Sequence, residues 1–243
     1  MEIKHAHIGY TDSLFMVENL TVKPGEILCI LGNNGCGKST LLQTMAGFLS
    51  PLKGMVVRDT HQQIAFLGSK SQSHPQLKVG QALLLAFNKH KPWYKSYSAD
   101  QMTACDALLK EYNLLHKKGA YVNELSDGQM QKLWLGQALL SNPDILFLDE
   151  PTGHLDATNT AFIFMKLKHW VETENKTVVL TSHKIDWILQ FSDNILLIDD
   201  NKSEQFSTDH PELVTRLNNC FSGSYHKVDF GKNQYQLQFK NKN

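Results

Sequence analysis

The stretch Gly32-Asn33-Asn34-Gly35-Cys36-Gly37-Lys38-Ser39-Thr40 carries the strongest indication of how this chain is built. Its three glycines allow the backbone to turn tightly, so that successive N–H groups point toward phosphate oxygens. Lys38 is suited to contact the β- and γ-phosphates of a nucleotide, and Ser39 to ligate the Mg²⁺ ion that bridges them. The stretch predicts a phosphate-binding loop, but alone it does not choose among kinases, GTPases and ATPases.

The segments on either side of this loop support the same interpretation. Glu26–Leu31 is typical of a buried strand, and Leu41–Ala46 is typical of a helix that ends at Gly47. A loop between a strand and a helix receives partial positive charge from the helix start, which favours a bound phosphate. We therefore expect a strand, the loop and a helix in that order.

A pair of acidic residues follows a second buried strand. Ile145–Leu148 is wholly apolar, as expected of a central parallel strand covered on both faces, and it ends in Asp149 and Glu150. Carboxylates at the carboxyl end of such a strand face the ligand crevice. We expect Asp149 to hold Mg²⁺ through its water shell, and Glu150 to polarise the water that attacks the γ-phosphate.

Three further motifs stand in a fixed order around these elements. Leu125-Ser126-Asp127-Gly128-Gln129 precedes the acidic pair, Pro151–Asp156 follows it, and His183 comes after a later apolar run. With Tyr10 near the start, these motifs closely resemble the ATP-binding-cassette (ABC) ATPases from about Ile3 to Asp199. The resemblance implies an α/β fold, namely a P-loop NTPase cassette with a RecA-like core, an antiparallel β lobe and an inserted helical lobe.

The resemblance also implies ATP and Mg²⁺ as cofactors and a role for each motif residue. Tyr10 would stack on adenine, and His183 would contact the γ-phosphate and steady the attacking water. The implied catalytic residues are Glu150, His183 and Lys38, the implied metal ligands are Ser39 and Asp149, and the implied nucleotide contacts are Tyr10, Gly32, Asn33, Asn34, Gly35, Cys36, Gly37, Lys38, Ser39, Thr40, Ser126, Gly128, Gln129 and Asp156.

Members of this family act as head-to-tail dimers, which implies a second copy of this chain as a partner. ATP on the loop of one subunit would be capped by Ser126 and Gly128 of the partner subunit. Gly128 would admit a close approach, and a helix beginning near Ser126 would aim its positive end at the γ-phosphate. Asp156 would link the two ATP sites across the interface.

The chain departs from the family pattern at Ser69. It follows the expected strand Ile64–Leu67 at the position where a metal-contacting glutamine is usual. The shorter hydroxyl would need an intervening water to reach the metal, so Ser69 is a candidate ligand of a weaker kind. Gln72 could substitute if the loop bends. Asp127 replaces a second glycine of the family motif, which the family tolerates.

Composition excludes several classes of function. Lys plus Arg and Asp plus Glu are both 24, so no electrostatic argument exists for nucleic acid as a partner. Cys29, Cys36, Cys105 and Cys220 form neither a metal-type pair nor a disulfide framework, and they suit a reducing compartment. Met1–His5 is not a secretory signal, and no apolar run approaches the ~20 residues of a membrane span. We expect another chain to cross the membrane if this protein works there.

We expect two structural units. An ABC ATP-binding domain is expected over residues 1–205, with the helical lobe inserted at about 77–138, and a short helix-and-hairpin extension over 206–243. Ser69–Pro75 and Lys91–Tyr97 are candidate contact segments for a membrane partner, the latter because exposed aromatics among lysines often mark interfaces. A loop pinned by one buried tryptophan explains Lys91–Tyr97 equally well.

Within the family, the chain resembles the ATPase subunits of importers for iron-siderophore, haem and cobalamin complexes. This resemblance lies in the length of the chain, the sequence of Asn123–Gly128, the Pro92-Trp93 segment and the presence of Ser69. This implies a peripheral protein at the cytoplasmic face of the inner (cell) membrane. Its expected partners are integral membrane permease subunits, a second copy of the ATPase and, indirectly, a substrate-binding protein.

Two other classes of ABC protein stay open. A soluble, non-transport ATPase such as that of iron–sulfur cluster assembly has similar length, but usually carries Gly-Gly-Glu where this chain has Asp127-Gly128-Gln129. An exporter ATPase would differ mainly in its partner. No residue of this chain names the cargo, because selection of the cargo lies in the permease and the binding protein.

Overall fold

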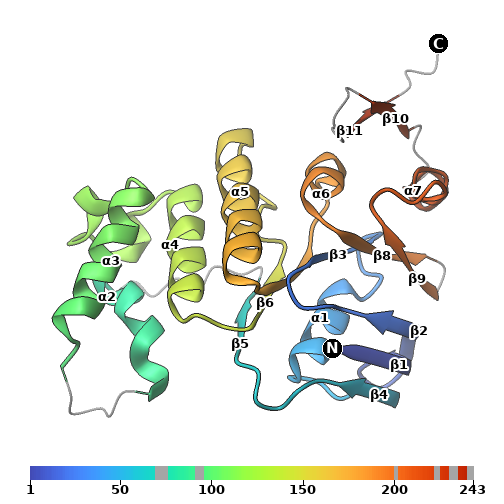
Figure 1. Ribbon diagram of the computed structural model, residues 1–243, viewed down its shortest axis with the longest axis horizontal. Coiled ribbons are helices and arrows are strands. Elements are labelled where there is room, and N and C mark those ends of the chain that lie inside the picture. Colours follow the sequence, from blue (N-terminus) through green and yellow to red (C-terminus); the bar gives the residue numbers. More distant parts are fainter. Residues whose placement is uncertain (69–75, 91–95, 200–201, 222–224, 230–234, 240–243) are drawn as a thin grey trace.

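The centre of the molecule is one mixed sheet with the strand order β4-β1-β2-β9-β8-β3-β7-β6-β5 (Figure 1). The computed structural model describes residues 1–68, 76–90, 96–199, 202–221, 225–229 and 235–239. The strands of the sheet are β1 (Glu2–Gly9), β2 (Ser13–Thr21), β3 (Ile27–Gly32), β4 (Lys53–Val57), β5 (Ile64–Leu67), β6 (Ile145–Asp149), β7 (Thr177–Thr181), β8 (Asn194–Asp199) and β9 (Lys202–Ser207).

Helices surround this sheet and extend beyond it on one side (Figure 1). Within the described ranges, no helix combines the length and the apolar composition that crossing a bilayer requires. The helices are α1 (Lys38–Ala46), α2 (Val79–Leu84), α3 (Ala99–Glu111), α4 (Asp127–Leu140), α5 (Ala157–Glu174), α6 (Ile185–Phe191) and α7 (Leu213–Phe221), with short 3₁₀ turns at Leu85–His90, Leu115–Lys117 and Val122–Glu124.

The parallel half of the sheet is built around β3, which pairs with β7 on one side and with β8 on the other. All of its residues are buried. Cys29 and Leu31 belong to the core that includes α5 and α6, whereas Leu28 and Ile30 belong to the core that includes α1. Because successive side chains of a strand point to opposite faces, a strand covered on both faces must be apolar throughout.

The antiparallel half is formed by β1, which pairs with β2 and β4. It is continuous with the parallel half, because β9 pairs antiparallel with β8 and lies parallel to β2 at Met16 and Lys202. The expected antiparallel lobe and the expected core are thus two parts of one hydrogen-bonded sheet.

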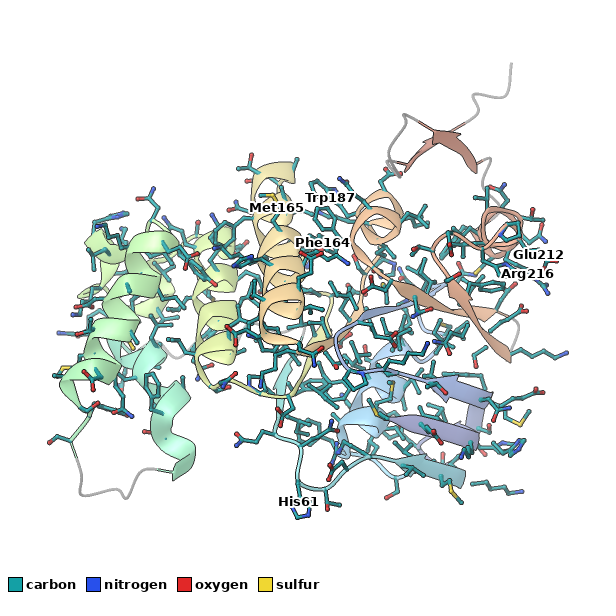
Figure 2. The ribbon with its side chains drawn as sticks, viewed as in Figure 1. His61, Phe164, Met165, Trp187, Glu212 and Arg216 are labelled. Carbon is teal, nitrogen blue, oxygen red and sulfur yellow. The ribbon has the colours of Figure 1, made fainter. Side chains whose placement is uncertain are left out.

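The helices α5 and α6 pack side by side on one face of the sheet through aromatic rings (Figure 2). Phe164 of α5 is fully buried and stacks on Trp187 of α6, with ring centroids 5.9 Å apart and an interplanar angle of 12°. The next residue on α5, Met165, points to solvent and is 55% exposed. The helix that follows the acidic pair is therefore packed at Phe164 against the helix that follows β7.

The helical lobe has a hydrophobic core of its own. Leu83 of α2, Leu109 of α3 and Leu133 of α4 are fully buried together. The lobe extends slightly past the expected end at residue 138, because α4 continues to Leu140.

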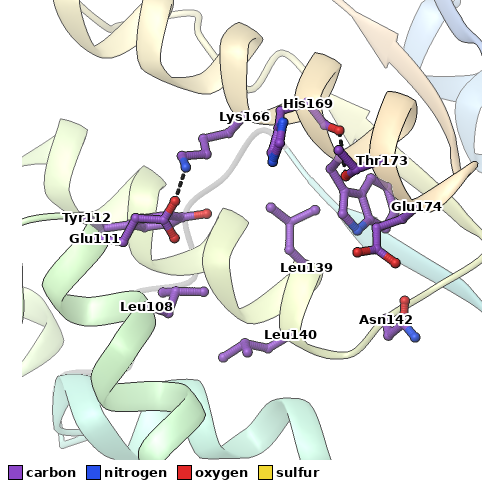
Figure 3. Close-up of a pocket in the computed structure, with 11 residues that line it drawn as sticks. Leu108, Glu111, Tyr112, Leu139, Leu140, Asn142, Lys166, His169, Thr173 and Glu174 are labelled. Atoms are coloured by element: carbon purple, nitrogen blue, oxygen red, sulfur yellow. Dashed lines mark hydrogen bonds and ion pairs between the residues drawn. The ribbon is translucent and has the colours of Figure 1, made fainter.

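A cavity of about 450 Å³ lies where the helical lobe meets α5 (Figure 3). An ion pair between Glu111 of α3 and Lys166 of α5 joins the two bodies beside it. Tyr112 also meets Phe162 of α5 edge to face, with ring centroids 4.9 Å apart. Leu135 and Ala138 of α4 are buried in the same core as β3 and α5, so the lobe is attached to the sheet domain through this apolar contact as well as through the ion pair and the aromatic pair beside the cavity.

The end of the described chain is more closely joined to the main domain than expected. The expected boundary at residue 205 falls inside β9, whose pairing with β8 continues to Ser207. Leu213 and Leu217 of α7 are buried in the same core as β3. The expected division is wrong at this point, because Phe206 is the only apolar residue in Lys202–Ser207 and the sequence gives no other sign of a strand. After α7, strands β10 (Tyr225–Asp229) and β11 (Tyr235–Phe239) form the expected hairpin.

Gly54 of β4 offers a test of the edge of the sheet. Its φ is 79°, and an added Cβ would lie 2.1 Å from the carbonyl oxygen of His5. We expect Gly54→Ala to lower the free energy of unfolding by about 1 to 3 kcal/mol, because a left-handed backbone and a clash with backbone must both be relieved. Chemical denaturation measures the change. Gly119→Ala is the matched control, since no atom lies within 4 Å of an added Cβ there, and an equal loss in both variants would contradict the explanation.

Candidate functional site

The phosphate-binding loop leaves the carboxyl end of β3 and ends at the start of α1, as the sequence predicts. Gly37 precedes α1 with a φ of 102°, and an added Cβ would lie 2.9 Å from the ring of Phe15 in β2. Any other residue there would be strained in its backbone and would also meet that ring. Asn34 and Gly35 are exposed at the tip of the loop, and Thr40 is buried in the first turn of α1.

The side chain of Lys38 is held by backbone carbonyl groups at the beginning of the loop. This side chain is buried, and Nζ donates hydrogen bonds to the carbonyl oxygens of Gly32 at 2.9 Å and Asn33 at 3.0 Å. Both acceptors lie at the beginning of the loop, so the ammonium group lies inside the curve of the backbone. A cation in this position suits the β- and γ-phosphates of a nucleotide.

The Asp149 carboxylate joins the loop to two strands. Its Oδ1 accepts hydrogen bonds from the hydroxyls of Ser39 at 3.0 Å and Thr181 at 2.7 Å. The carboxylate is only 6% exposed, at the end of β6. A carboxylate and a serine hydroxyl within hydrogen-bond distance form a hard oxygen donor set, which is the kind that Mg²⁺ prefers. The residues expected to hold Mg²⁺ therefore lie together.

Glu150 is positioned by its backbone and by one histidine. Its φ is 50°, its N–H donates to the hydroxyl of Thr181 at 2.9 Å, and its Oε1 lies 2.6 Å from Nε2 of His183. Glu150 and His183 both line a cavity of about 460 Å³ that Asn34 and Gly35 also line. The expected base and the expected histidine thus meet directly beside the tip of the phosphate-binding loop.

The Ser126 motif forms the start of α4. Ser126 is the N-cap, and its hydroxyl accepts from the N–H of Gln129 at 3.4 Å. The Gln129 side chain in turn accepts from the N–H of Ser126 at 3.1 Å, which completes a capping box. In this single chain, the amide of Gln129 therefore serves the helix start.

Gly128 is buried, and an added Cβ would lie 2.6 Å from the side-chain nitrogen of Asn159 in α5. The small size of this residue thus serves a contact within the chain, which sequence reasoning missed. Neither Ser126 nor Gly128 is among the described residues that line the cavity beside Glu150. One chain alone does not bring this motif to its own phosphate-binding loop.

Asp156, Tyr10 and Ser69 complete the predicted set. Asp156 caps α5, and both of its carboxylate oxygens accept from Asn159, at 2.7 Å from the backbone N–H and 2.9 Å from the side chain. Tyr10 follows β1 and is 63% exposed, so its ring is accessible. Ser69, Gln72 and the whole segment Ser69–Pro75 lie outside the described residues, as do residues 91–95 of the other candidate contact segment.

Two contacts of the loop could not be read from the sequence. The Asn33 side chain donates to the carbonyl oxygen of Cys220 at 3.2 Å, which ties the loop to α7. The Cys36 sulfur lies beneath the loop, 2.7 Å from where a Cβ on Gly32 would stand. Burial raises the pKa of the Cys36 thiol, because a buried site disfavours the thiolate. The Cys36 side chain thus occupies the space beside Gly32.

Comparison with known proteins agrees with this geometry. The family model described as ABC transporter matches residues 16–153. The probable siderophore transport system ATP-binding protein YusV of Bacillus subtilis is 30% identical over 85% of this chain and 79% of that protein. The petrobactin import ATP-binding protein FpuD of Bacillus anthracis is 30% identical over 83% of this chain and 78% of that protein.

Solved structures match the fold over most of the chain. A metal-chelate type ABC transporter in an inward-facing conformation gives a TM-score of 0.85 at 25% identity, covering 98% of this chain and 95% of that one. A dimeric ATP-binding cassette in a post-hydrolysis state, bound to ADP and Pi, gives a TM-score of 0.74 at 25% identity, covering 86% and 99%. The predicted cassette fold is confirmed.

Thr181 provides a test of the site, because its hydroxyl serves both acidic residues and is fully buried. Thr181→Val keeps the shape but leaves the Glu150 N–H without its acceptor and the Asp149 carboxylate with one donor fewer. We expect the free energy of unfolding to fall by about 1 to 3 kcal/mol, measured by chemical denaturation. Thr181→Ser keeps the hydroxyl and is the control. Equal stability of the valine variant and the wild type would contradict this account.

Proposed function

This chain belongs to the ABC transporter family of ATP-binding proteins, and from this premise we propose that it is the ATP-hydrolysing subunit of an importer. It binds ATP as a cassette of that family, and its activity is ATP hydrolysis. The observation that carries the proposal is the Glu150–His183 pair beside the phosphate-binding loop.

In the proposed reaction, Glu150 polarises the water that attacks the γ-phosphate. His183 holds the Glu150 carboxylate through Nε2 and contacts the γ-phosphate. Lys38 neutralises charge on the β- and γ-phosphates, and the loop N–H groups orient them. Ser39 and Asp149 would hold Mg²⁺, which supplies charge neutralisation between these phosphates. Tyr10 would stack on the adenine base.

A second copy of the chain completes the proposed site. The exposed Ser126 lies at the N-terminus of α4, where partial positive charge and free N–H groups favour a phosphate. Because this motif does not line the cavity of its own chain, Ser126 and Gly128 of the partner subunit would cap the γ-phosphate. The similar cassette with ADP and Pi is a dimer, which supports the pairing of two copies. Asp156, at the start of α5, would lie between the two sites.

The class of cargo is argued from the relatives. The two import proteins named above are described as siderophore and petrobactin systems, and the similar transporter structure is of the metal-chelate type. These similarities favour an iron-siderophore as the cargo, and the resemblance of the sequence to the ATPases of haem and cobalamin importers adds these two to the class. A separate permease would cross the membrane and receive the cargo from a substrate-binding protein. This chain would then lie peripherally at the cytoplasmic face.

Glu150→Gln tests the catalytic assignment. A general base contributes typically 10²- to 10⁴-fold, so we expect kcat to fall by about that factor, or about 3 to 5 kcal/mol of transition-state stabilisation. ATP binding is expected to survive, so the variant accumulates as an ATP-bound dimer in light-scattering measurements. Glu172→Gln is the control, since this glutamate near the end of α5 has a side chain 61% exposed. Unchanged kcat in the Glu150 variant would reject the assignment.

The transport assignment has its own experiment. Tagged Glu150→Gln protein is purified from detergent-solubilised native membranes with ATP and Mg²⁺, and the accompanying proteins are identified. We expect a polytopic permease to be recovered, and its own relatives then narrow the cargo. Recovery of soluble partners alone would reject the importer and favour a non-transport ABC ATPase. Recovery of an export permease would favour the exporter class.

A further inference from the structure

Lys184 follows His183 directly, yet its side chain reaches a different segment of the site. Nζ donates hydrogen bonds to the carbonyl oxygen of Leu155 at 2.7 Å and to the hydroxyl of Thr160 at 2.6 Å. Leu155 belongs to the segment between Glu150 and α5, and Thr160 lies in the first turn of α5. Two successive residues after β7 thus contact the two ends of the segment Glu150–Asp156.

The environment of this ammonium group is unusual for a lysine. Its side chain is half-buried, and Thr160 is fully buried. Burial lowers the pKa of Lys184, and the nearby Asp156 carboxylate opposes that shift. A long, flexible side chain loses conformational entropy and hydration when it is held in this way. The two hydrogen bonds that the ammonium group donates offset this cost, because hydrogen bonds from a charged donor are stronger than those between neutral groups.

The contacts form a closed path through the site. His183 Nε2 lies next to Glu150 Oε1, and the backbone continues from Glu150 to Leu155. The carbonyl oxygen of Leu155 accepts from Lys184, which is the residue after His183, so the path closes. Lys184 N–H also donates to the hydroxyl of Ser182 at 3.2 Å, which fixes the backbone at this point. The ammonium group of Lys184 is therefore the contact that links the backbone next to His183 to Leu155, the residue before the Asp156 cap of α5.

We propose that Lys184 is a positioning residue that couples the Glu150–His183 pair of one ATP site to the Leu155–Asp156 segment at the dimer interface. This inference rests on the proposed function, because the Leu155–Asp156 segment lies near a second ATP site only when two copies of the chain form the dimer. Release of the γ-phosphate, sensed by His183, is then transmitted through the ammonium group to Asp156. The partner subunit responds, and hydrolysis at the two sites becomes cooperative.

A purely structural role of Lys184 makes a different prediction, and Lys176 provides the matched control. Lys176 precedes β7 at the opposite end of that strand and pairs with Asp144 at 3.1 Å. Its side chain is 15% exposed, so Lys176→Met also removes a largely buried ammonium group and an interaction. Both Lys176→Met and Lys184→Met are expected to lower the melting temperature. Only Lys184→Met is expected to change the kinetics.

The experiment measures ATP hydrolysis against ATP concentration for the wild type, Lys184→Met, Lys184→Arg and Lys176→Met, with nucleotide affinity measured separately. For Lys184→Met we expect a loss of about tenfold in kcat, as for the loss of a charged hydrogen bond, and a Hill coefficient near that of independent sites. Lys184 lines the same cavity as Asn34 and Gly35, but its ammonium group is bonded to Leu155 and Thr160, so the Kd for ATP is expected to stay within about twofold. Lys184→Arg keeps the charge and the donors, so it is expected to restore most of kcat.

The possible results separate the inference from the proposed function. An unchanged kcat and Hill coefficient in Lys184→Met, with only a lower melting temperature, would overturn the inference and leave the proposed function standing. A parallel loss of kcat in Lys176→Met would overturn it too, because the effect would then be general. A wild type without ATPase activity would overturn the proposed function, and the inference with it. A further supporting result is weaker ATP-bound dimerisation of Glu150→Gln/Lys184→Met than of Glu150→Gln alone.

Discussion

Three segments that are distant in the chain meet at one carboxylate oxygen, Oδ1 of Asp149. Ser39 is 110 residues away in sequence and Thr181 is 32 residues away, and both donate to it. The carboxylate is nearly excluded from solvent, so each donor that it keeps matters for stability. Because Thr181 also accepts from the N–H of Glu150, the same small network sets the backbone of the proposed general base. The sheet brings the ends of β3, β6 and β7 together, and these hydrogen bonds fix the position of the phosphate-binding loop relative to β6 and β7.

The elements that carry the chemistry could be predicted because their local sequence leaves little choice. Ile27–Leu31 of β3 and Ile145–Leu148 of β6 are wholly apolar, as expected of strands covered on both faces, and Asn33 and Asp149 follow them closely. Gly47 adopts the left-handed backbone that closes α1, so the end of this helix could be located to the residue, whereas its start lies at Lys38, earlier than the expected Leu41. Ser126 with Gln129 is a helix start that is visible in the sequence alone. The proximity of Glu150 and His183 followed from the family resemblance, and the structure has them in contact.

The remaining features depend on contacts between distant residues, for which the sequence carries no local sign. β9 has one apolar residue, so only its pairing with β8 identifies it as a strand. α7 has an apolar stripe, but nothing in that stripe says that Asn33 of the loop reaches its last turn. In the sequence Lys184 cannot be told from a surface lysine, and the role proposed for it rests on the acceptors around its ammonium group. The sequence predicts that Gly128 admits the close approach of a bound phosphate. Within one chain, however, the group that approaches it is the side chain of Asn159 in α5.

The strand order has a consequence for synthesis on the ribosome. β3 leads into the loop, yet its neighbours come much later, since Ile27 pairs with Val178 and Leu28 with Asn194. At typical elongation rates those neighbours are made roughly 10 to 30 s after β3. Until then Ile27–Leu31 is an apolar, unpaired strand, which is the kind of surface that chaperones protect. The helical lobe has its core within one contiguous stretch and can form earlier. A nascent chain therefore gains no stability from cellular ATP until most of it has left the ribosome.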